Sequence, residues 1–255
     1  VCNPTVKFKA LCDEADRNGS EYVATGHYAR VLERDGVFIL RKAACLARDQ
    51  SYMLYSLSQA QLARLVLPLG ERAKADVRAL AKADALPSAS APDSQEICFI
   101  PDGDYPAYIA AKGLRGKSGR FIAPDGSVLG AHDGVEHYTV GQRRGLRVSL
   151  GRPVFVRRIL GNGDIELAFA DGEFDAGVEI AQLKLNPAYT LKSGDAYSVK
   201  LRSAARPAGC RIGAADGQGC TLVFDTPQRA PAPGQSAVLY DGELLVGGGV
   251  IGRCL

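Results

Sequence analysis

The pattern of the chain changes near residue 100, and this change most limits the folds available to it. Before that point, segments with helical periodicity alternate with short apolar runs, whereas the segments 119–130 and 153–170 show short alternating strands separated by Asp-Gly, Gly-Asn and Gly-Asp turns. At least five further strands follow Val178 at the spacing of a small barrel or sandwich. The sequence therefore predicts an α+β multidomain chain, with an α/β part at 1–100, a small β-rich central domain at 101–174 and a C-terminal β-barrel at 175–255.

Within the first part, the local signals give an order of elements. Asn3 and Pro4 predict the start of a helix that runs to about Arg17 and is closed by Gly19. Two apolar runs predict strands of a mixed sheet, at 22–25 and 36–43. Apolar spacing predicts amphipathic helices after Ser58 and at 74–85, and a further helix is expected at about 105–112.

Composition excludes several classes of protein. The chain has 255 residues, 46% of them apolar and 23% charged, which is enough apolar material for a sizeable core. No stretch approaches the roughly 18 apolar residues of a membrane-spanning helix, so no membrane partner is expected. Seven cysteines at irregular spacing favour reduced thiols in a cytoplasm over a disulfide framework. Because there is no CxxC motif and the three histidines are scattered, we expect no metal site.

Basic residues are concentrated in the middle of the chain. Residues 101–170 hold 10 basic against 7 acidic side chains, and six of the basic ones are arginines at 143, 144, 147, 152, 157 and 158. Guanidinium forks bind phosphate oxygens in a bidentate geometry, which suits a nucleic-acid surface. A solvated face that binds nothing explains the same charge equally well.

Six motifs occur in one collinear order along nearly the whole chain. They are CNPTVKFKAL from Cys2, ATGHYAR from Ala24, RDQSYMLYSL from Arg48, DSQEICFI around Cys98, HYTVGQRRGL from His137 and APGQSAVLYDGE from Ala232. Each motif alone is a weak signal, but together they make the chain similar to the tRNA-specific 2-thiouridylase family, MnmA or TrmU. For the first domain, the resemblance implies the C-terminal part of an α/β ATP-pyrophosphatase domain, of the adenine nucleotide alpha hydrolase-like kind. For the central domain, 101–174, it implies contact with tRNA.

The resemblance implies a cytoplasmic ATP-dependent enzyme that adenylates C2 of the wobble uridine in tRNA of the Lys, Glu or Gln type and then introduces sulfur there. It implies that Cys98 carries a persulfide, charged by a donor protein, and that Cys2 is the second thiol, with a disulfide between them in the cycle. Thiol and persulfide chemistry agree with this division, because a terminal persulfide sulfur is a soft nucleophile and a second thiol can release it by exchange. Taken without the resemblance, each cysteine is equally well explained as a buried, inert residue.

Other site residues also come from the resemblance. Gly26 is implied to approach ATP through its backbone and His27 to contact tRNA, although a packed or capping histidine is an alternative. Arg48, Asp49 and Gln50 match a tRNA-contacting segment in which the family usually has lysine first. Arg202, Ser203 and Gln235 match tRNA contacts near the anticodon loop, where serine replaces the usual tyrosine and loses its ability to stack.

One family motif is absent from this sequence. The family's glycine- and serine-rich loop holds the ATP phosphates, but the glycines before Ser51 stand alone at 19, 26 and 36. We therefore expect a fragment that is inactive in isolation, with the Mg²⁺ ligands outside this sequence. Three interpretations remain open: the sulfur-transferring enzyme, a non-catalytic tRNA-binding fragment, and an adenylating enzyme that acts on a small metabolite.

Overall fold

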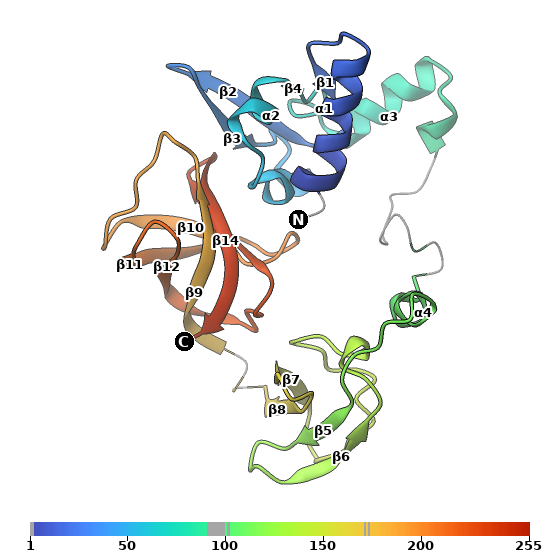
Figure 1. Cartoon of the computed structure of the whole chain (residues 1–255), viewed down its shortest axis with the longest axis vertical. Helices are drawn as coiled ribbons and strands as arrows, with labels where there is room; N and C mark the ends of the chain where they lie inside the picture. The colour runs from blue at the N-terminus through green and yellow to red at the C-terminus, as the bar shows by residue number, and fades with distance from the viewer. Residues whose placement is uncertain (1–2, 91–99, 101–102, 171, 173) are drawn as a thin grey trace. The chain divides into compact units, whose positions relative to one another are not determined.

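The computed structural model describes residues 3–90, 100, 103–170, 172 and 174–255. The contacts divide the chain into two units, of which the first joins Val1–Ala91, Ala176–Thr226 and Pro233–Leu255. The second unit joins Pro92–Asp175 with Pro227–Ala232, so a short segment within the carboxyl-terminal third of the chain packs with the middle of the chain. The mixture of α and β elements that the sequence predicts is present (Figure 1).

The first helix begins and ends where the sequence predicts. A π-helical turn, Asn3–Lys7, leads into α1 (Phe8–Arg17), and Gly19 follows with a φ of 65°. Phe8 and Ala15 lie on the buried face of α1, seven residues or about two helical turns apart. After the helix, β1 (Val23–Ala24) pairs in parallel with β4 (Leu65–Val66).

The strand predicted at 36–43 exists, but its partner is not the one expected. The strands β2 (Ala29–Arg34) and β3 (Val37–Lys42) form an antiparallel hairpin across Asp35 and Gly36, whose φ values of 51° and 76° are the pair that a type I′ turn needs. β3 then pairs with a carboxyl-terminal strand through Leu244 and Arg41. The expected mixed sheet with 22–25 is therefore wrong: the tight turn closes a hairpin, and that hairpin joins the barrel sheet.

Short helical segments complete this region. They are η2 (Leu46–Arg48), η3 (Ser51–Leu54), α2 (Gln59–Ala63), α3 (Lys74–Ala83) and η4 (Pro87–Ser90). Ser58 caps α2 in a reciprocal capping box with Gln61, which explains the sharp start of this helix after Ser58. The apolar residues of α3 are less buried than their helical spacing suggests, since no residue of this helix is fully buried.

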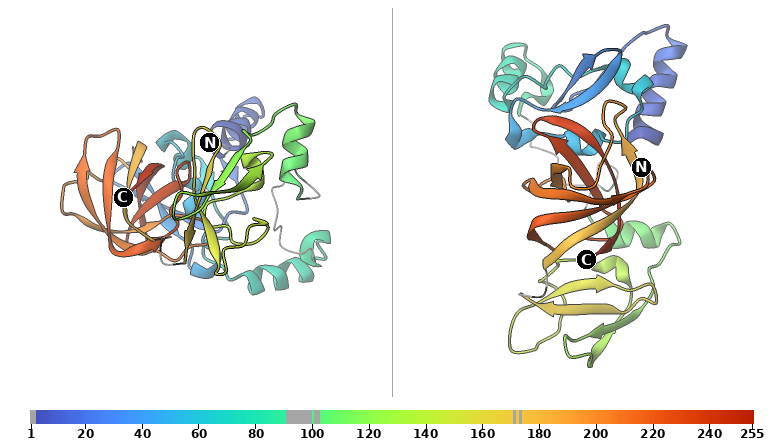
Figure 2. Two further views of the ribbon diagram at one scale, coloured as in Figure 1. Left: turned by 90° about the horizontal axis from the view of Figure 1, so that it is seen from below. Right: turned by 90° about the vertical axis from the view of Figure 1, so that its left-hand side faces the viewer.

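Six strands of the first unit close into a barrel. They are β9 (Phe174–Leu185), β10 (Ala196–Lys200), β11 (Ala208–Ala215), β12 (Cys220–Arg229), β13 (Ser236–Asp241) and β14 (Leu244–Cys254). Their order is β13-β10-β11-β12-β9-β14, and pairing of β13 with β14 completes the ring, as Figures 1 and 2 show. The predicted C-terminal barrel is thus confirmed.

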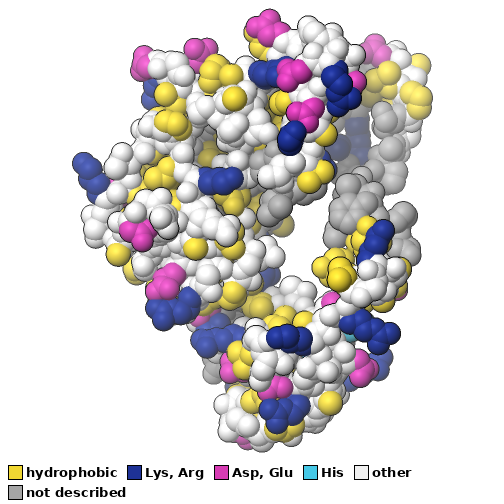
Figure 3. All heavy atoms as spheres, in the orientation of Figure 1, with side chains coloured by type: hydrophobic (Ala, Val, Ile, Leu, Met, Phe, Trp, Pro, Cys, Tyr) yellow, Lys and Arg dark blue, Asp and Glu magenta, His cyan; other side chains and the backbone are white. Residues whose placement is uncertain are grey.

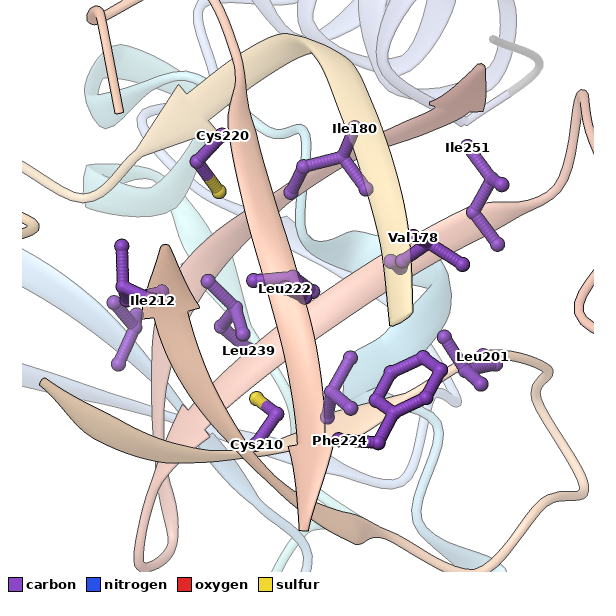
Figure 4. Packing of buried hydrophobic residues seen from close by; sticks show 13 residues of the cluster. Val178, Ile180, Leu201, Cys210, Ile212, Cys220, Leu222, Phe224, Leu239 and Ile251 are labelled. Atoms are coloured by element: carbon purple, nitrogen blue, oxygen red, sulfur yellow. The ribbon is translucent and has the colours of Figure 1, made fainter. Parts of the chain in front are cut away.

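The interior of the barrel is apolar, and two of the seven cysteines are part of it. Cys210 and Cys220 are 1% and 6% exposed and lie among Ile180, Leu222 and Phe224 (Figure 4). Burial raises the pKa of the Cys210 thiol to about 12 and that of Cys220 to about 11. Neither thiol ionises near neutral pH, so both act as core residues, as the sequence predicts.

The second unit is a small four-stranded sheet with one helix. Its elements are α4 (Tyr105–Ala111), β5 (Gly119–Ile122), β6 (Val128–His132), η5 (Val135–His137), β7 (Val154–Ile159) and β8 (Ile165–Phe169). The strand order is β6-β5-β8-β7. Phe121, Val156 and Ile165 form its core together with Ala230 and Ala232, which is why the segment 227–232 belongs to this unit.

Candidate nucleic-acid interface

The loop between β3 and η3 is organised by the buried carboxylate of Asp49. Its Oδ1 accepts hydrogen bonds from the backbone N–H groups of Ala43 at 3.1 Å and Ser51 at 3.2 Å, and Oδ2 accepts from Ser51 Oγ at 3.0 Å. Lys200 Nζ, from the end of β10, lies 3.8 Å from Oδ2, and the two side chains are 4% and 8% exposed. The carboxylate therefore holds the loop against the barrel instead of facing solvent.

The tRNA contact of Asp49 stays a prediction. The carboxylate oxygens are engaged by backbone, hydroxyl and ammonium groups. Arg48 is exposed at the end of η2 in the same loop.

Gln50 fixes the loop to the segment that carries His27. The backbone N–H of Gln50 donates to Tyr28 O at 2.8 Å, and its side-chain Oε1 accepts from the Tyr28 N–H at 2.9 Å. These two hydrogen bonds to Tyr28 restrict the relative movement of the two segments. Arg48–Gln50 and His27, which are far apart in sequence, are thereby brought together.

His27 is a partly buried, neutral imidazole. Its Nδ1 lies 2.9 Å from Thr25 Oγ1, and its ring centroid is 5.8 Å from that of Phe8 on α1. Burial, and then the nearby charge of Lys7, lowers the pKa of His27. An uncharged imidazole can donate or accept a hydrogen bond to a base edge, but it does not attract phosphate as a cation would.

Gly26 is exposed, and the described residues do not require a glycine there. A Cβ at this position would meet only Leu69 Cδ1, at an ordinary contact distance of 3.7 Å. The ATP contact predicted for Gly26 stays a prediction. It fits this geometry, because the backbone is open to close approach by a ligand.

The three predicted residues of the barrel lie at one rim. β10 and β13 run antiparallel, with Lys200 opposite Val238, so the residues after β10 and those before β13 lie at the same end. Arg202, Ser203 and Gln235 are in these two segments, and all three are exposed. The pairing register thus brings Gln235 to the end of the barrel that holds Arg202 and Ser203, although it is more than thirty residues away in sequence.

The η3 segment joins this rim to the loop of Asp49. Tyr52 Oη donates to Ser236 O at 2.9 Å, and Ser236 Oγ donates to Tyr55 Oη at 3.3 Å. Asn3 Nδ2 donates to Met53 O at 2.8 Å, which fixes the start of the chain to the same segment. Burial raises the pKa of Tyr52, so its hydroxyl stays protonated as a donor.

Three polar residues that support this surface were missed by the sequence analysis. Ser51 and Tyr240 are fully buried and hydrogen-bonded to each other at 3.1 Å, and Lys200 completes the cluster at Asp49. Lys42 adds a cation 4.4 Å from the Tyr240 ring centroid, and burial lowers its pKa. In the sequence, this cluster could have been suspected only from Lys200, a charged residue at the end of the predicted strand AYSVK.

Comparison with known proteins gives a consistent result for all three parts of the chain. Family models match residues 1–102 as a tRNA methyl transferase HUP domain, 109–163 as a tRNA methyl transferase PRC-barrel domain and 183–251 as an aminomethyltransferase beta-barrel domain. The tRNA-specific 2-thiouridylase MnmA of Lachnoclostridium phytofermentans is 39% identical over 254 residues, which are 98% of this chain and 71% of that protein. MnmA of Acetivibrio thermocellus is 40% identical over 255 residues, with the same coverage. The chain belongs to the MnmA family.

Membership of the MnmA family confirms the predicted fold class of each part. The first domain is of the HUP type, the middle domain is a PRC-barrel and the last is a β-barrel. In the part of the chain that the structure describes, no helix has the length and apolar character to cross a membrane, and no group of His, Cys, Asp and Glu side chains could hold a metal ion.

The two cysteines to which the MnmA resemblance assigns the chemistry, Cys2 and Cys98, lie outside the described residues. Their neighbours are described: Asn3 is held on η3, and Ile100 is 1% exposed. Roles for both thiols remain predictions, as do the RNA contacts of His27 and of the barrel rim.

Proposed function

We propose that the chain acts in tRNA 2-thiouridine synthesis, replacing the C2 oxygen of the wobble uridine with sulfur. The observation that carries the proposal is the set of contacts made by Asp49 and Gln50. Gln50 holds the loop of Arg48 on Tyr28, the residue after His27, and Asp49 holds it on Lys200, at the end of the strand that precedes Arg202. A neutral imidazole, an amide and exposed guanidinium groups on one unit suit a loop of RNA with splayed bases. Relatives named tRNA-specific 2-thiouridylase support RNA as the partner.

We assign the sulfur transfer to Cys2 and Cys98. Cys98, charged by a persulfide donor protein, holds a terminal sulfur, and ATP with Mg²⁺ supplies the adenyl group that turns the C2 oxygen into a leaving group. The thiolate of Cys2 attacks the inner sulfur of the persulfide, which forms a disulfide between Cys2 and Cys98 and releases the outer sulfur as hydrosulfide. Hydrosulfide adds to C2, the oxygen departs with AMP, and a thiol reductant returns two electrons to the disulfide. Attack on C2 by the persulfide itself, followed by the same exchange, has the same balance of atoms and electrons.

The described residues bind and orient the RNA. Arg48 and Arg202 pair with phosphate oxygens, while Gln235 and His27 offer hydrogen bonds to base edges near the reacting uridine. Ser203 adds a hydroxyl to the same rim. Gly26 leaves its backbone open to the nucleotide, and no described group forms a site for the Mg²⁺ ion.

The test loads sulfur onto the chain without requiring ATP turnover. The 255-residue chain is treated with a small-molecule persulfide donor, and its peptides are examined by mass spectrometry. We expect one added sulfur atom on Cys98, lost in Cys98→Ser and retained in Cys12→Ser, a half-buried cysteine on α1. The thiolate of Cys2 should then displace the outer sulfur as hydrosulfide and leave a disulfide between Cys2 and Cys98, without added oxidant. Sulfur distributed equally over the exposed thiols would contradict the assignment.

A second measurement separates the enzyme from a non-catalytic RNA-binding protein. In the presence of ATP and a tRNA with an unmodified wobble uridine, Cys98→Ser in a thiolation-competent enzyme should abolish 2-thiouridine and leave tRNA affinity unchanged. If Cys98 takes up no sulfur from the donor while the chain still binds tRNA, the non-catalytic function is the correct one. Because the phosphate loop is absent from this sequence, we expect residues 1–255 alone to release no pyrophosphate.

A further inference from the structure

The segment 49–52, here called the bridge segment, contacts two neighbouring barrel strands, β10 and β13. The three contacts are Asp49 Oδ2 to Lys200 Nζ at 3.8 Å, Ser51 Oγ to Tyr240 Oη at 3.1 Å and Tyr52 Oη to Ser236 O at 2.9 Å. Every side chain that takes part is buried, from 0% exposed in Ser51 to 9% in Tyr52. Because water is excluded, these polar contacts are stronger and harder to replace than contacts at a surface.

On the barrel side, two of the three contacts lie beside residues that are predicted to bind RNA. Lys200 ends β10, two residues before Arg202. Ser236 begins β13, directly after Gln235. Burial raises the pKa of Tyr52 and the charge of Arg202 opposes this rise, so the guanidinium group lies near the Tyr52 hydroxyl. The bridge segment is therefore attached to the barrel rim itself.

On its other side, the bridge segment adjoins the predicted RNA contacts of the first domain. Arg48 precedes it directly, and the side chain of Gln50 within it accepts from the Tyr28 N–H at 2.9 Å, next to His27. One short segment thus joins two sets of predicted RNA contacts that come from different domains. Both sets belong to the first unit, so these contacts fix the spacing between them.

The total charge of this unit does not select a binding position. Lys and Arg side chains are interspersed with Asp and Glu side chains over its visible face (Figure 3). Neighbouring charges of opposite sign largely cancel beyond roughly 10 Å, the Debye length at about 0.1 M salt. Binding of RNA to this unit should therefore depend on where individual groups lie and not on an overall attraction.

We propose that Lys200 and Tyr52 are positioning residues, which hold the RNA contacts of the barrel rim at a fixed distance from those of the first domain. Both side chains are buried, so they act through the exposed residues beside them and not by touching RNA. With the spacing fixed in advance, RNA that binds one set of contacts meets the other set without a further cost in ordering. The inference rests on the proposed function, from which it takes RNA as the ligand.

The test asks whether each positioning residue acts through the rim. Tyr52→Phe removes the hydroxyl that bonds to the barrel and keeps the ring. Lys200→Met removes the ammonium group, while Asp49 keeps its three hydrogen bonds. Each change is made in the parent chain and in a rim variant, Arg202→Gln with Gln235→Ala. Affinity for an unmodified tRNA transcript is then measured for each of these chains.

Glu243→Gln is the matched control. Glu243 precedes β14 and, like the bridge segment, joins the barrel to the first domain, through Arg30 at 3.2 Å and Arg41 at 2.6 Å. No predicted RNA contact lies next to Glu243 in the sequence. Thermal melting of every variant separates lost folding from lost binding.

In the parent, we expect Tyr52→Phe and Lys200→Met each to weaken tRNA binding about threefold to tenfold. In the rim variant, the same changes should weaken it less than about twofold, because the distance to a missing contact no longer matters. Glu243→Gln should change the affinity less than about twofold in both backgrounds.

Two results would overturn the inference, and they differ in what they say of the proposed function. If Tyr52→Phe and Lys200→Met weaken binding by equal factors in the parent and the rim variant, or no more than Glu243→Gln does, both residues are only structural and the proposed function stands. If the parent chain binds no tRNA at any salt concentration, both proposals fail together. Should Lys200→Met fail to fold, Tyr52→Phe decides the question alone.

Discussion

Two loops display arginine in this molecule, and they are built in opposite ways. The loop of Arg48 rests on the buried carboxylate of Asp49 and on Gln50, which bonds to Tyr28 once through its side chain and once through its backbone N–H. The loop of Arg147 is held by the half-buried Gln142, whose hydrogen bonds are exposed, and by an arginine stacked on Phe169. Burial makes the first loop rigid and sensitive to single changes, whereas the second should tolerate them.

The largest effect is expected from Asp49→Asn. Removing the charge leaves Lys200 buried without its counter-ion, so we expect a loss of about 3 kcal/mol in the free energy of unfolding, measured in urea. Asp13→Asn, in an exposed pair with Lys9, is the control and should cost less than about 1 kcal/mol. Adding Lys200→Met to Asp49→Asn should recover part of the loss. Equal effects at Asp13 and Asp49 would remove the distinction between the two loops.

Gln50→Ala tests whether the side-chain hydrogen bond from Gln50 to Tyr28 matters for tRNA binding as well as for stability. We expect a loss of about 1 to 3 kcal/mol, because a buried backbone N–H loses its partner, together with weaker tRNA binding. Gln59 offers a matched control, since it donates to Phe38 O and accepts from Phe38 N–H, both at 2.8 Å. Gln59→Ala removes two side-chain hydrogen bonds where Gln50→Ala removes one, so it should destabilise the protein at least as much and leave tRNA affinity unchanged. If both variants bind tRNA like the parent, Gln50 is only structural.

Gln142→Ala is the counterpart in the loop of the second unit. Its two hydrogen bonds are exposed, so water replaces them and the loss of stability should be less than about 1 kcal/mol. The salt dependence of tRNA binding should nevertheless become shallower, because the loop is less well ordered. If Gln142→Ala costs as much stability as Gln50→Ala, the burial of the hydrogen bonds does not explain the difference between the two loops.

The smallest effect concerns pH. Arg120 donates to Asp164 at 2.9 Å and lowers the pKa of that carboxyl to about 2, below the value of about 3.9 of an unfolded chain. Its contribution to stability is therefore complete above about pH 4 and is lost as the pH falls toward 2. Arg120→Gln should flatten this part of the stability curve of the second unit, followed by circular dichroism. If the loss of stability below about pH 4 is the same in Arg120→Gln as in the parent, the Arg120–Asp164 pair is not its cause.

The sequence predicted local structure well where the signals were local. The helix to Arg17, the helix after Ser58 and the strands of the barrel follow from caps, apolar periodicity and turn residues. The pairing of 36–43 was not predicted, because which strand lies beside β3 depends on a contact with Leu244 two hundred residues away. In the same way, the burial of Asp49 against Lys200 depends on a strand that lies about 150 residues away in sequence.

What the sequence alone determined is the family, the order of the domains and the types of side chain available for sulfur and RNA chemistry. These are properties of composition, spacing and motif order, which a linear chain carries directly. Only the tertiary structure decided which of those side chains face solvent and which support them. The same residue type can do either, as Arg147 and Arg157 show, because burial and counter-ions come from segments that are distant in sequence.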